Sequence, residues 1–166
     1  MSTGQIVLVE CLFDAFAARD EDALLAIMDP GIEFFGPTAM VLNEGKCYRG
    51  HEGMKRYLQD VDSLWAELEI MPSRYREVGN HVVVMGRVKA RARDGLELDA
   101  PAAWVWRVEG NRVAWGCVYG DRGTMPRSLQ EDGRGEYTVG PRPAKRPATP
   151  ETPRIRATQE HLSRTS

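Results

Sequence analysis

Residues 81–120, HVVVMGRVKARARDGLELDAPAAWVWRVEGNRVAWGCVYG, decide the fold because their apolar residues recur at every second position. Within 81–93 the even-numbered residues are apolar or small, and the odd-numbered face ends in basic residues. Two turn signals divide the stretch, Asp94-Gly95 and Glu109-Gly110-Asn111. Period-two alternation between such turns is typical of β-hairpins. We therefore expect strands at about 81–93, 97–109 and 112–120, preceded by one at about 67–78.

The N-terminal half has helical periodicity instead. From about Gln5 to Arg19, apolar residues recur at spacings of three and four. Asp20 can cap a second helix at 21–28, which Asp29-Pro30-Gly31 ends because proline cannot continue the hydrogen-bond ladder. A short strand at 32–35, a loop at 36–50 and a helix at about 52–65 complete this half. Three helices followed by an antiparallel meander are typical of the α+β class.

The composition limits the kinds of partner. The chain has 166 residues, of which 42% are hydrophobic and 28% charged, with a formal net charge of −2. No global basic field favours nucleic acid, and no apolar run approaches the ~20 residues of a membrane span. Three cysteines without close spacing, Cys11, Cys47 and Cys117, predict neither a disulfide framework nor a metal site. With no signal-peptide pattern at the start, we expect a cytoplasmic protein. We also expect no cofactor.

The composition changes near residue 130. Five of the ten prolines lie within residues 141–166, and few residues after 130 could anchor a core. Such a segment cannot offset the entropy lost on ordering it. We therefore expect one domain over residues 1–130 and a Pro/Arg-rich disordered tail over 131–166. The tail is either a solvated extension or a weak docking segment.

Four short motifs resemble the nuclear-transport-factor-like superfamily, in particular its SnoaL-like (polyketide cyclase) and ketosteroid-isomerase-like branch. They are FAARDEDAL at 16–24, MDPGIEF at 28–34, YRGHEGM at 48–54 and VYGDR at 118–122. The resemblance implies a cone, in which three helices pack on a strongly curved, mixed but mostly antiparallel sheet around an apolar cavity. It also implies a homodimer through the outer sheet face.

The catalytic residues of two branches are missing at the matching positions. Where ketosteroid isomerases have a carboxylate base, a tyrosine and a protonated carboxylic acid, this chain has Gly36, Leu12 and Ala103. Where limonene-epoxide-hydrolase relatives have an arginine and an aspartate, it has Gly116 and Cys117. We therefore expect neither mechanism.

The same resemblance turns the odd-numbered face of the last two strands towards the cavity. The expected lining is apolar and aromatic: Leu12, Phe16, Phe34, Tyr57, Val84, Val88, Ala103, Val105, Trp115, Cys117 and Tyr119. Trp104 and Trp106 are then expected on the outer face, where large apolar groups suggest a dimer contact.

Three residues are candidates for chemistry. Asp121 is the candidate acid or base at the cavity mouth, and Tyr119 and Tyr57 are candidate hydrogen-bond donors. Each has a structural alternative, since an aspartate can cap a turn and a tyrosine can simply pack. The sequence thus indicates a protein that binds a small, largely apolar molecule, with cofactor-independent isomerisation, cyclisation or dehydration as the enzymatic option. The alternatives are a non-catalytic carrier and a dimeric interaction module.

Overall fold

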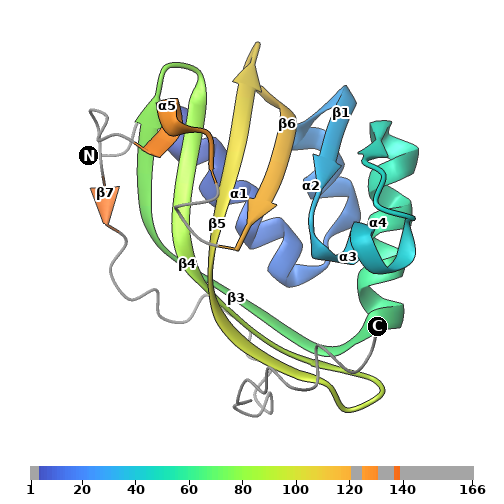
Figure 1. Ribbon diagram of the computed structural model, residues 1–166. Helices are drawn as coiled ribbons and strands as arrows, with labels where there is room; N and C mark the ends of the chain where they lie inside the picture. The colour runs from blue at the N-terminus through green and yellow to red at the C-terminus, as the bar shows by residue number, and fades with distance from the viewer. Residues whose placement is uncertain (1–3, 121–124, 131–136, 139–166) are drawn as a thin grey trace.

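The computed structural model describes residues 4–120, 125–130 and 137–138. Its helices are α1 (Gly4–Ala18), α2 (Glu21–Ile27), α3 (Pro37–Leu42), α4 (Gly50–Leu64) and α5 (Arg127–Gln130). Its strands are β1 (Met28–Phe35), β2 (Tyr48–Arg49), β3 (Trp65–Val78), β4 (His81–Ala92), β5 (Glu97–Glu109), β6 (Arg112–Tyr119) and β7 (Tyr137–Thr138). Figure 1 shows α1, α2 and α4 gathered against one side of the sheet.

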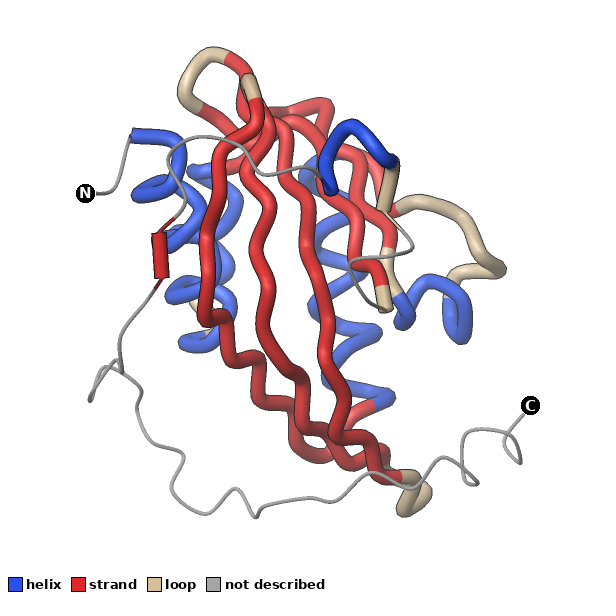
Figure 2. Tube along the Cα trace, turned by 60° about the vertical axis from the view of Figure 1, so that its left-hand side comes forward, coloured by secondary structure: helices blue, strands red, loops and turns tan. Residues whose placement is uncertain are grey.

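One curved sheet contains all seven strands, in the order β2-β1-β6-β5-β4-β3-β7. Only the contact between β1 and β6 is parallel, and the other strand pairs are antiparallel. Figure 2 shows the long central strands bending along their length, so that the sheet is concave towards the helices. The α+β architecture and the mixed, mostly antiparallel sheet expected from the sequence are confirmed.

The local signals act as predicted at α1 and α2. The Asp20 carboxylate accepts a hydrogen bond from the Ala23 amide at 3.1 Å, which caps the N-terminus of α2. Between the two helices, Arg19 adopts a left-handed backbone conformation, with φ of 54°. This single residue turns the chain so that α2 leaves α1 without a longer loop.

Three elements of the N-terminal half differ from the sequence expectation. Residues 36–50 were expected to be a loop, but they contain strand β2 and helix α3, which has Pro37 in its first turn, where a missing amide hydrogen costs nothing. Strand β1 begins at Met28 rather than at Ile32 and so includes Pro30. Proline is tolerated because the register with β6 is irregular between Met28 and Glu33, where no regular ladder needs its amide.

Bulges in β3 bend the sheet. Pro72 pairs with Gly86 and Arg74 with Met85, so Ser73 is an extra residue on β3. A bulge of this kind increases the local twist and reverses which residues face the core. Strands β3 and β4 approach each other so closely at this point that a Cβ atom on Gly86 would overlap the backbone carbonyl of Met71. Gly86 therefore allows the bend that makes the sheet concave.

An apolar cluster lies on each face of the sheet. The larger cluster joins α1, α2 and α4 to the concave face and includes Ile6, Val9, Val61 and Val82, each with no exposed surface. The smaller cluster lies on the convex face, where Met125 and Leu129 pack over Val83, Ala103 and Val105. Arg76, only 6% exposed, donates a hydrogen bond to the Leu129 carbonyl there. No helix among the described residues is long and apolar enough to cross a membrane.

The predicted tail is described only in part. Tyr137 and Thr138 form β7 and pair with Tyr75 and Arg74 of β3. The open edge of β3 offers backbone donors and acceptors that this short extended segment satisfies. Residues 131–136 and 139–166 lie outside the described part, and the division into a domain and a tail stays a prediction.

Replacing Gly86 by alanine tests the bend. We expect Gly86→Ala to destabilise the fold by about 3 kcal/mol or more, because the new methyl group meets a backbone carbonyl that cannot move away cheaply. Urea unfolding followed by circular dichroism measures the loss. The control is Gly4→Ala in α1, where nothing lies within 4 Å of the added Cβ atom. Equal stability of both variants would show that the strands do not approach as described.

Candidate functional site: an aromatic pocket between the helices and the sheet

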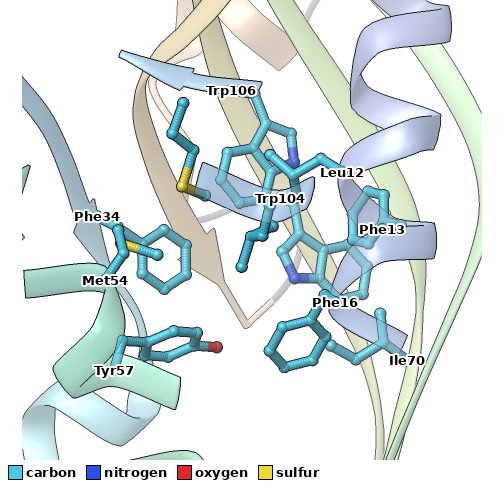
Figure 3. Close-up of a pocket in the computed structure, with 11 residues that line it drawn as sticks. Leu12, Phe13, Phe16, Phe34, Met54, Tyr57, Ile70, Trp104 and Trp106 are labelled. Carbon is cyan, nitrogen blue, oxygen red and sulfur yellow. The ribbon is translucent and has the colours of Figure 1, made fainter. Parts of the chain in front are cut away.

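A pocket lies between the helices and the concave face of the sheet. Its free interior volume is about 30 Å³, room for about two water molecules, and it is partly open to solvent. Its walls come from α1, α2, α4, β1, β3 and β5, and they consist of Leu12, Phe13, Phe16, Leu24, Met28, Phe34, Met54, Tyr57, Ile70, Trp104 and Trp106. Figure 3 shows most of these side chains surrounding a common space.

Aromatic contacts hold one wall in place. Gly116 of β6 is in register with Phe34 on one side and with Trp106 on the other. Because Gly116 has no side chain, the two large rings meet above it and stack with centroids 5.5 Å apart and an interplanar angle of 9°. A Cβ atom at this position would overlap the Trp106 ring.

Phe13 and Tyr57 extend the aromatic wall. The Phe13 ring meets Trp104 edge-on at 5.4 Å. The Tyr57 ring meets Phe34 at 4.9 Å and Phe16 at 6.0 Å. Interlocked rings of this kind restrict one another's rotamers, so the aromatic wall is closely packed.

Few polar atoms reach the pocket. The Tyr57 hydroxyl points into the open space towards Phe16 (Figure 3), and no described residue forms a hydrogen bond with it. The Trp104 indole nitrogen also has no partner among the described residues. The Trp106 indole nitrogen is buried and likewise has no partner among the described residues. All three groups can donate a hydrogen bond and the two indole N–H groups can only donate, so the polar surface of the pocket favours hydrogen-bond acceptors.

Tyr57 remains protonated at neutral pH. Burial raises the pKa of its hydroxyl well above the ordinary value, and the nearby Arg19 guanidinium lowers it only in part. A neutral phenol keeps its proton and can donate it in a hydrogen bond to a ligand oxygen. The ring is also packed from behind by Tyr48, at 5.3 Å.

Tyr48 is itself fixed by a carboxylate. Its hydroxyl donates to Asp60 at 2.7 Å, and Arg56 lies 3.5 Å from the same Asp60 oxygen. Burial and then this hydrogen bond raise the pKa of Tyr48, so its hydroxyl stays a donor. The Asp60 carboxylate is therefore engaged outside the pocket, where it holds the ring against which Tyr57 packs.

No acid or base lines the pocket within the described residues. His51 lies outside it, with Nε2 3.0 Å from the Met28 carbonyl oxygen. No group of three His, Cys, Asp or Glu residues in this part of the chain could hold a metal ion. The described walls can bind, orient and exclude water, but they supply no group that would remove a proton.

The predicted orientation of β5 and β6 is wrong. Trp104 and Trp106 face the pocket and are each 3% exposed, so they cannot form the predicted dimer contact on the outer face. Five residues predicted to line the cavity lie on the opposite, convex side of the sheet: Ala103, Val105, Trp115, Cys117 and Tyr119. Dimerisation itself stays a prediction.

The hairpin register explains the error. Val84 pairs with Trp104 and Val82 with Trp106, so the even-numbered residues of β4 and β5 share the concave face. In β6, Val108 pairs with Val113 but Arg107 with Trp115, which makes Ala114 an extra residue. This bulge turns Val113 to the concave face and Trp115 to the convex face, so constant alternation along β6 does not hold.

The remaining predicted residues divide into three groups. Leu12, Phe16, Phe34 and Tyr57 do line the pocket. Val84 and Val88 lie on its side of the sheet, but they belong to the packed core rather than to the pocket wall. Asp121, the candidate acid or base, lies outside the described residues. Whether any of these residues binds a ligand stays a prediction.

Cys117 and Tyr119 are close to each other on the convex face. Burial first, and then the hydrogen bond with Cys117, raise the pKa of Tyr119 to about 12. Burial likewise raises the pKa of the Cys117 thiol, which keeps it protonated and a poor nucleophile. The sheet separates both from the pocket, so neither serves the roles expected from the sequence at this site.

Several pocket residues were missed by the sequence analysis. Phe13, Met54 and Ile70 line the pocket beside the two tryptophans. The sequence did contain a signal for the two tryptophans. The Asp94-Gly95 turn pairs even-numbered residues of β4 with even-numbered residues of β5, and the even-numbered face of 81–93 is the apolar one. Ile70 had no such signal, since the bulge at Ser73 decides which residues of β3 face inwards.

The described residues form an α+β fold in which helices cover the concave face of a curved, mostly antiparallel sheet. Residues 9–115 match the SnoaL-like domain family, and the chain belongs to that family. A search of curated protein sequences finds no match.

Solved structures share the fold. An NTF2-like protein of unknown function from Burkholderia pseudomallei K96243 has 24% identity and a TM-score of 0.66, over 78% of this chain and 99% of that one. TerC, co-crystallised with polyporic acid, has 22% identity and a TM-score of 0.65, over 72% and 92%. A putative SnoaL-like polyketide cyclase from Jannaschia sp. CCS1 has 19% identity and a TM-score of 0.61, over 72% and 87%. At these identities the likeness shows the fold alone.

A methyl group at Gly116 tests the aromatic wall. We expect Gly116→Ala to displace the Trp106 ring, to lower stability by about 1–3 kcal/mol and to change the near-ultraviolet circular dichroism of the indoles. Gly120→Ala is the control, because nothing lies within 4 Å of its Cβ position. An unchanged aromatic spectrum in Gly116→Ala would contradict the stacking of Trp106 on Phe34.

Proposed function

We propose that the chain binds a small, largely apolar molecule that carries a hydrogen-bond acceptor such as a carbonyl oxygen, in the pocket between the helices and the sheet. The observation that carries this proposal is the Tyr57 hydroxyl, which has no described partner and points into an otherwise apolar space. A structural relative, TerC, was co-crystallised with a small organic molecule, polyporic acid, and this supports the use of the fold for such ligands.

The energetics favour an acceptor. The Trp106 indole N–H is a buried donor without a partner among the described residues, which costs about 1–3 kcal/mol relative to a satisfied donor. The Tyr57 hydroxyl is partly exposed, and a ligand oxygen at hydrogen-bond distance from it would add one hydrogen bond, while aromatic contact with Phe34 and Trp104 would bury the apolar body of the ligand. A ligand whose only polar groups are donors could bond the Tyr57 oxygen but would leave the indole N–H groups without an acceptor. The pocket therefore favours ligands that carry an acceptor.

Removal of the Tyr57 hydroxyl tests the proposal. With 2-acetylnaphthalene as a neutral aromatic ketone, we expect Tyr57→Phe to weaken binding about fivefold, which corresponds to one hydrogen bond of about 1 kcal/mol. Isothermal titration calorimetry measures both affinities. Tyr119→Phe is the matched control, because Tyr119 lies on the convex face and should not affect binding. If the two variants behave alike, the ligand carbonyl does not meet Tyr57.

Cofactor-independent acid–base chemistry is the second candidate. A neutral phenol that donates to a carbonyl oxygen would also stabilise the enolate formed when a base removes a proton from the adjacent carbon. The described walls contain no such base, so this candidate depends on Asp121. A non-catalytic carrier needs only the described residues.

Exchange of ligand protons for deuterium distinguishes a non-catalytic carrier from an enzyme. In D₂O, an enzyme of this kind would exchange the methyl protons of 2-acetylnaphthalene for deuterium, which proton NMR follows as loss of the methyl signal. We expect Asp121→Asn to abolish any protein-dependent exchange if Asp121 is the base. Binding without exchange in the wild-type protein would favour the carrier.

A further inference from the structure

Arg19 lies against the wall of the pocket rather than extending into solvent. Its guanidinium carbon is 4.4 Å from the centroid of the Phe16 ring, and its Nη1 donates to the Phe16 carbonyl at 2.7 Å. Phe16 lines the pocket and stacks on Tyr57 at an interplanar angle of 27°. The left-handed backbone of Arg19 turns the chain at the end of α1, where its side chain folds back over this ring.

The pocket is open on the same side. Tyr57 and Ile70 are its partly exposed residues, and the other residues of its wall are buried. Figure 3 places Ile70 beside Phe16, with the Tyr57 hydroxyl pointing towards that ring. The positive charge of Arg19 also acts on the Tyr57 hydroxyl, whose pKa it lowers against the effect of burial. A positive charge is therefore present where a ligand would enter.

The Arg19 guanidinium has N–H groups that form no hydrogen bond with the described residues. Of its five N–H groups, one on Nε faces Asp62 Oδ1 at 3.3 Å and one on Nη1 donates to the Phe16 carbonyl. The Nη2 group has no partner among the described residues. The pair with Asp62 is exposed and engages only one nitrogen, with side chains 34% and 63% exposed, so it competes weakly.

We propose that the ligand is an organic anion, an apolar body carrying one carboxylate or similar oxyanion, and that Arg19 is the residue that selects this charge at the open side of the pocket. The inference rests on the proposed function, since it requires a ligand in the pocket. Guanidinium and carboxylate form strong, directional pairs, whereas an apolar wall alone would bind charged and neutral molecules without preference for the charge. The carbonyl oxygen proposed to meet Tyr57 and the anionic group belong to the same small molecule.

Two ligands with the same aromatic body test the inference. 2-Naphthoate and 2-acetylnaphthalene both carry an acceptor oxygen, but 2-naphthoate has a carboxylate oxygen in place of the methyl group and is negatively charged at pH 7. In calorimetry with the wild-type chain, we expect 2-naphthoate to bind about tenfold more tightly, as for one charge-assisted hydrogen bond. This preference should shrink as sodium chloride rises from about 0.05 M to about 0.5 M.

Variants assign the preference to Arg19. Arg19→Gln should lose the preference for 2-naphthoate and keep its affinity for the neutral ketone within about twofold. Asp62→Asn removes the same exposed ion pair but leaves the guanidinium in place, so the preference should persist or increase. Arg19→Lys should retain part of it, because the charge remains while the fork of donors is lost. A merely structural role of Arg19 would change both affinities alike.

Each contrary result has a separate meaning. If the wild-type chain binds the ketone and binds 2-naphthoate no more tightly than the ketone, the inference about charge is wrong and the proposed function stands. If Arg19→Gln keeps the wild-type preference, Arg19 is not the selecting residue. If neither molecule binds the wild-type chain, the proposed function and the inference both fail.

Discussion

The stacking of Trp106 on Phe34 above Gly116 is the contact on which the pocket depends. The three residues lie in register on adjacent strands, with Gly116 in the middle. A side chain at the central position would separate the rings, whereas a glycine lets two large rings close over one strand. Because Phe34 also contacts Tyr57 of α4, this stack connects the sheet to the helix that supplies the donor.

The chemistry of the pocket follows from the polar groups that this packing leaves unpaired. Aromatic rings surround the Tyr57 hydroxyl, and a hydrogen bond made beside such apolar walls is stronger than one made in bulk water. Tyr57 retains its proton there because burial disfavours the charged phenolate. Asp60 does not enter the pocket, since Tyr48 and Arg56 engage it. The pocket thus holds free hydrogen-bond donors, with the positive charge of Arg19 beside Tyr57 and Phe16, as the proposed function requires.

The convex face of the sheet has a different role. Met125 and Leu129 cover Val83, Ala103 and Val105, and Arg76 is buried beneath them while bonded to the Leu129 carbonyl. Residues from beyond the strand meander therefore shield part of the face that the sequence analysis assigned to the cavity. Cys117 and Tyr119 lie on this side with raised pKa values, as packed groups rather than as reactive ones.

The sequence by itself determined the class of fold, because hydrophobic periodicity and turn residues act locally. The strands at 81–120, the cap at Asp20 and the helix that carries Tyr57 follow from such signals, as do the pocket positions of Leu12 and Phe16. Only the tertiary structure decided which face of β6 looks inwards, because the bulge at Ala114 reverses the alternation and leaves no local mark. It also decided that Arg19 lies on Phe16, since that contact depends on how α1 ends against its neighbours. A period of two predicts that a strand has two faces, but the pairing of distant strands selects the face that lines the pocket.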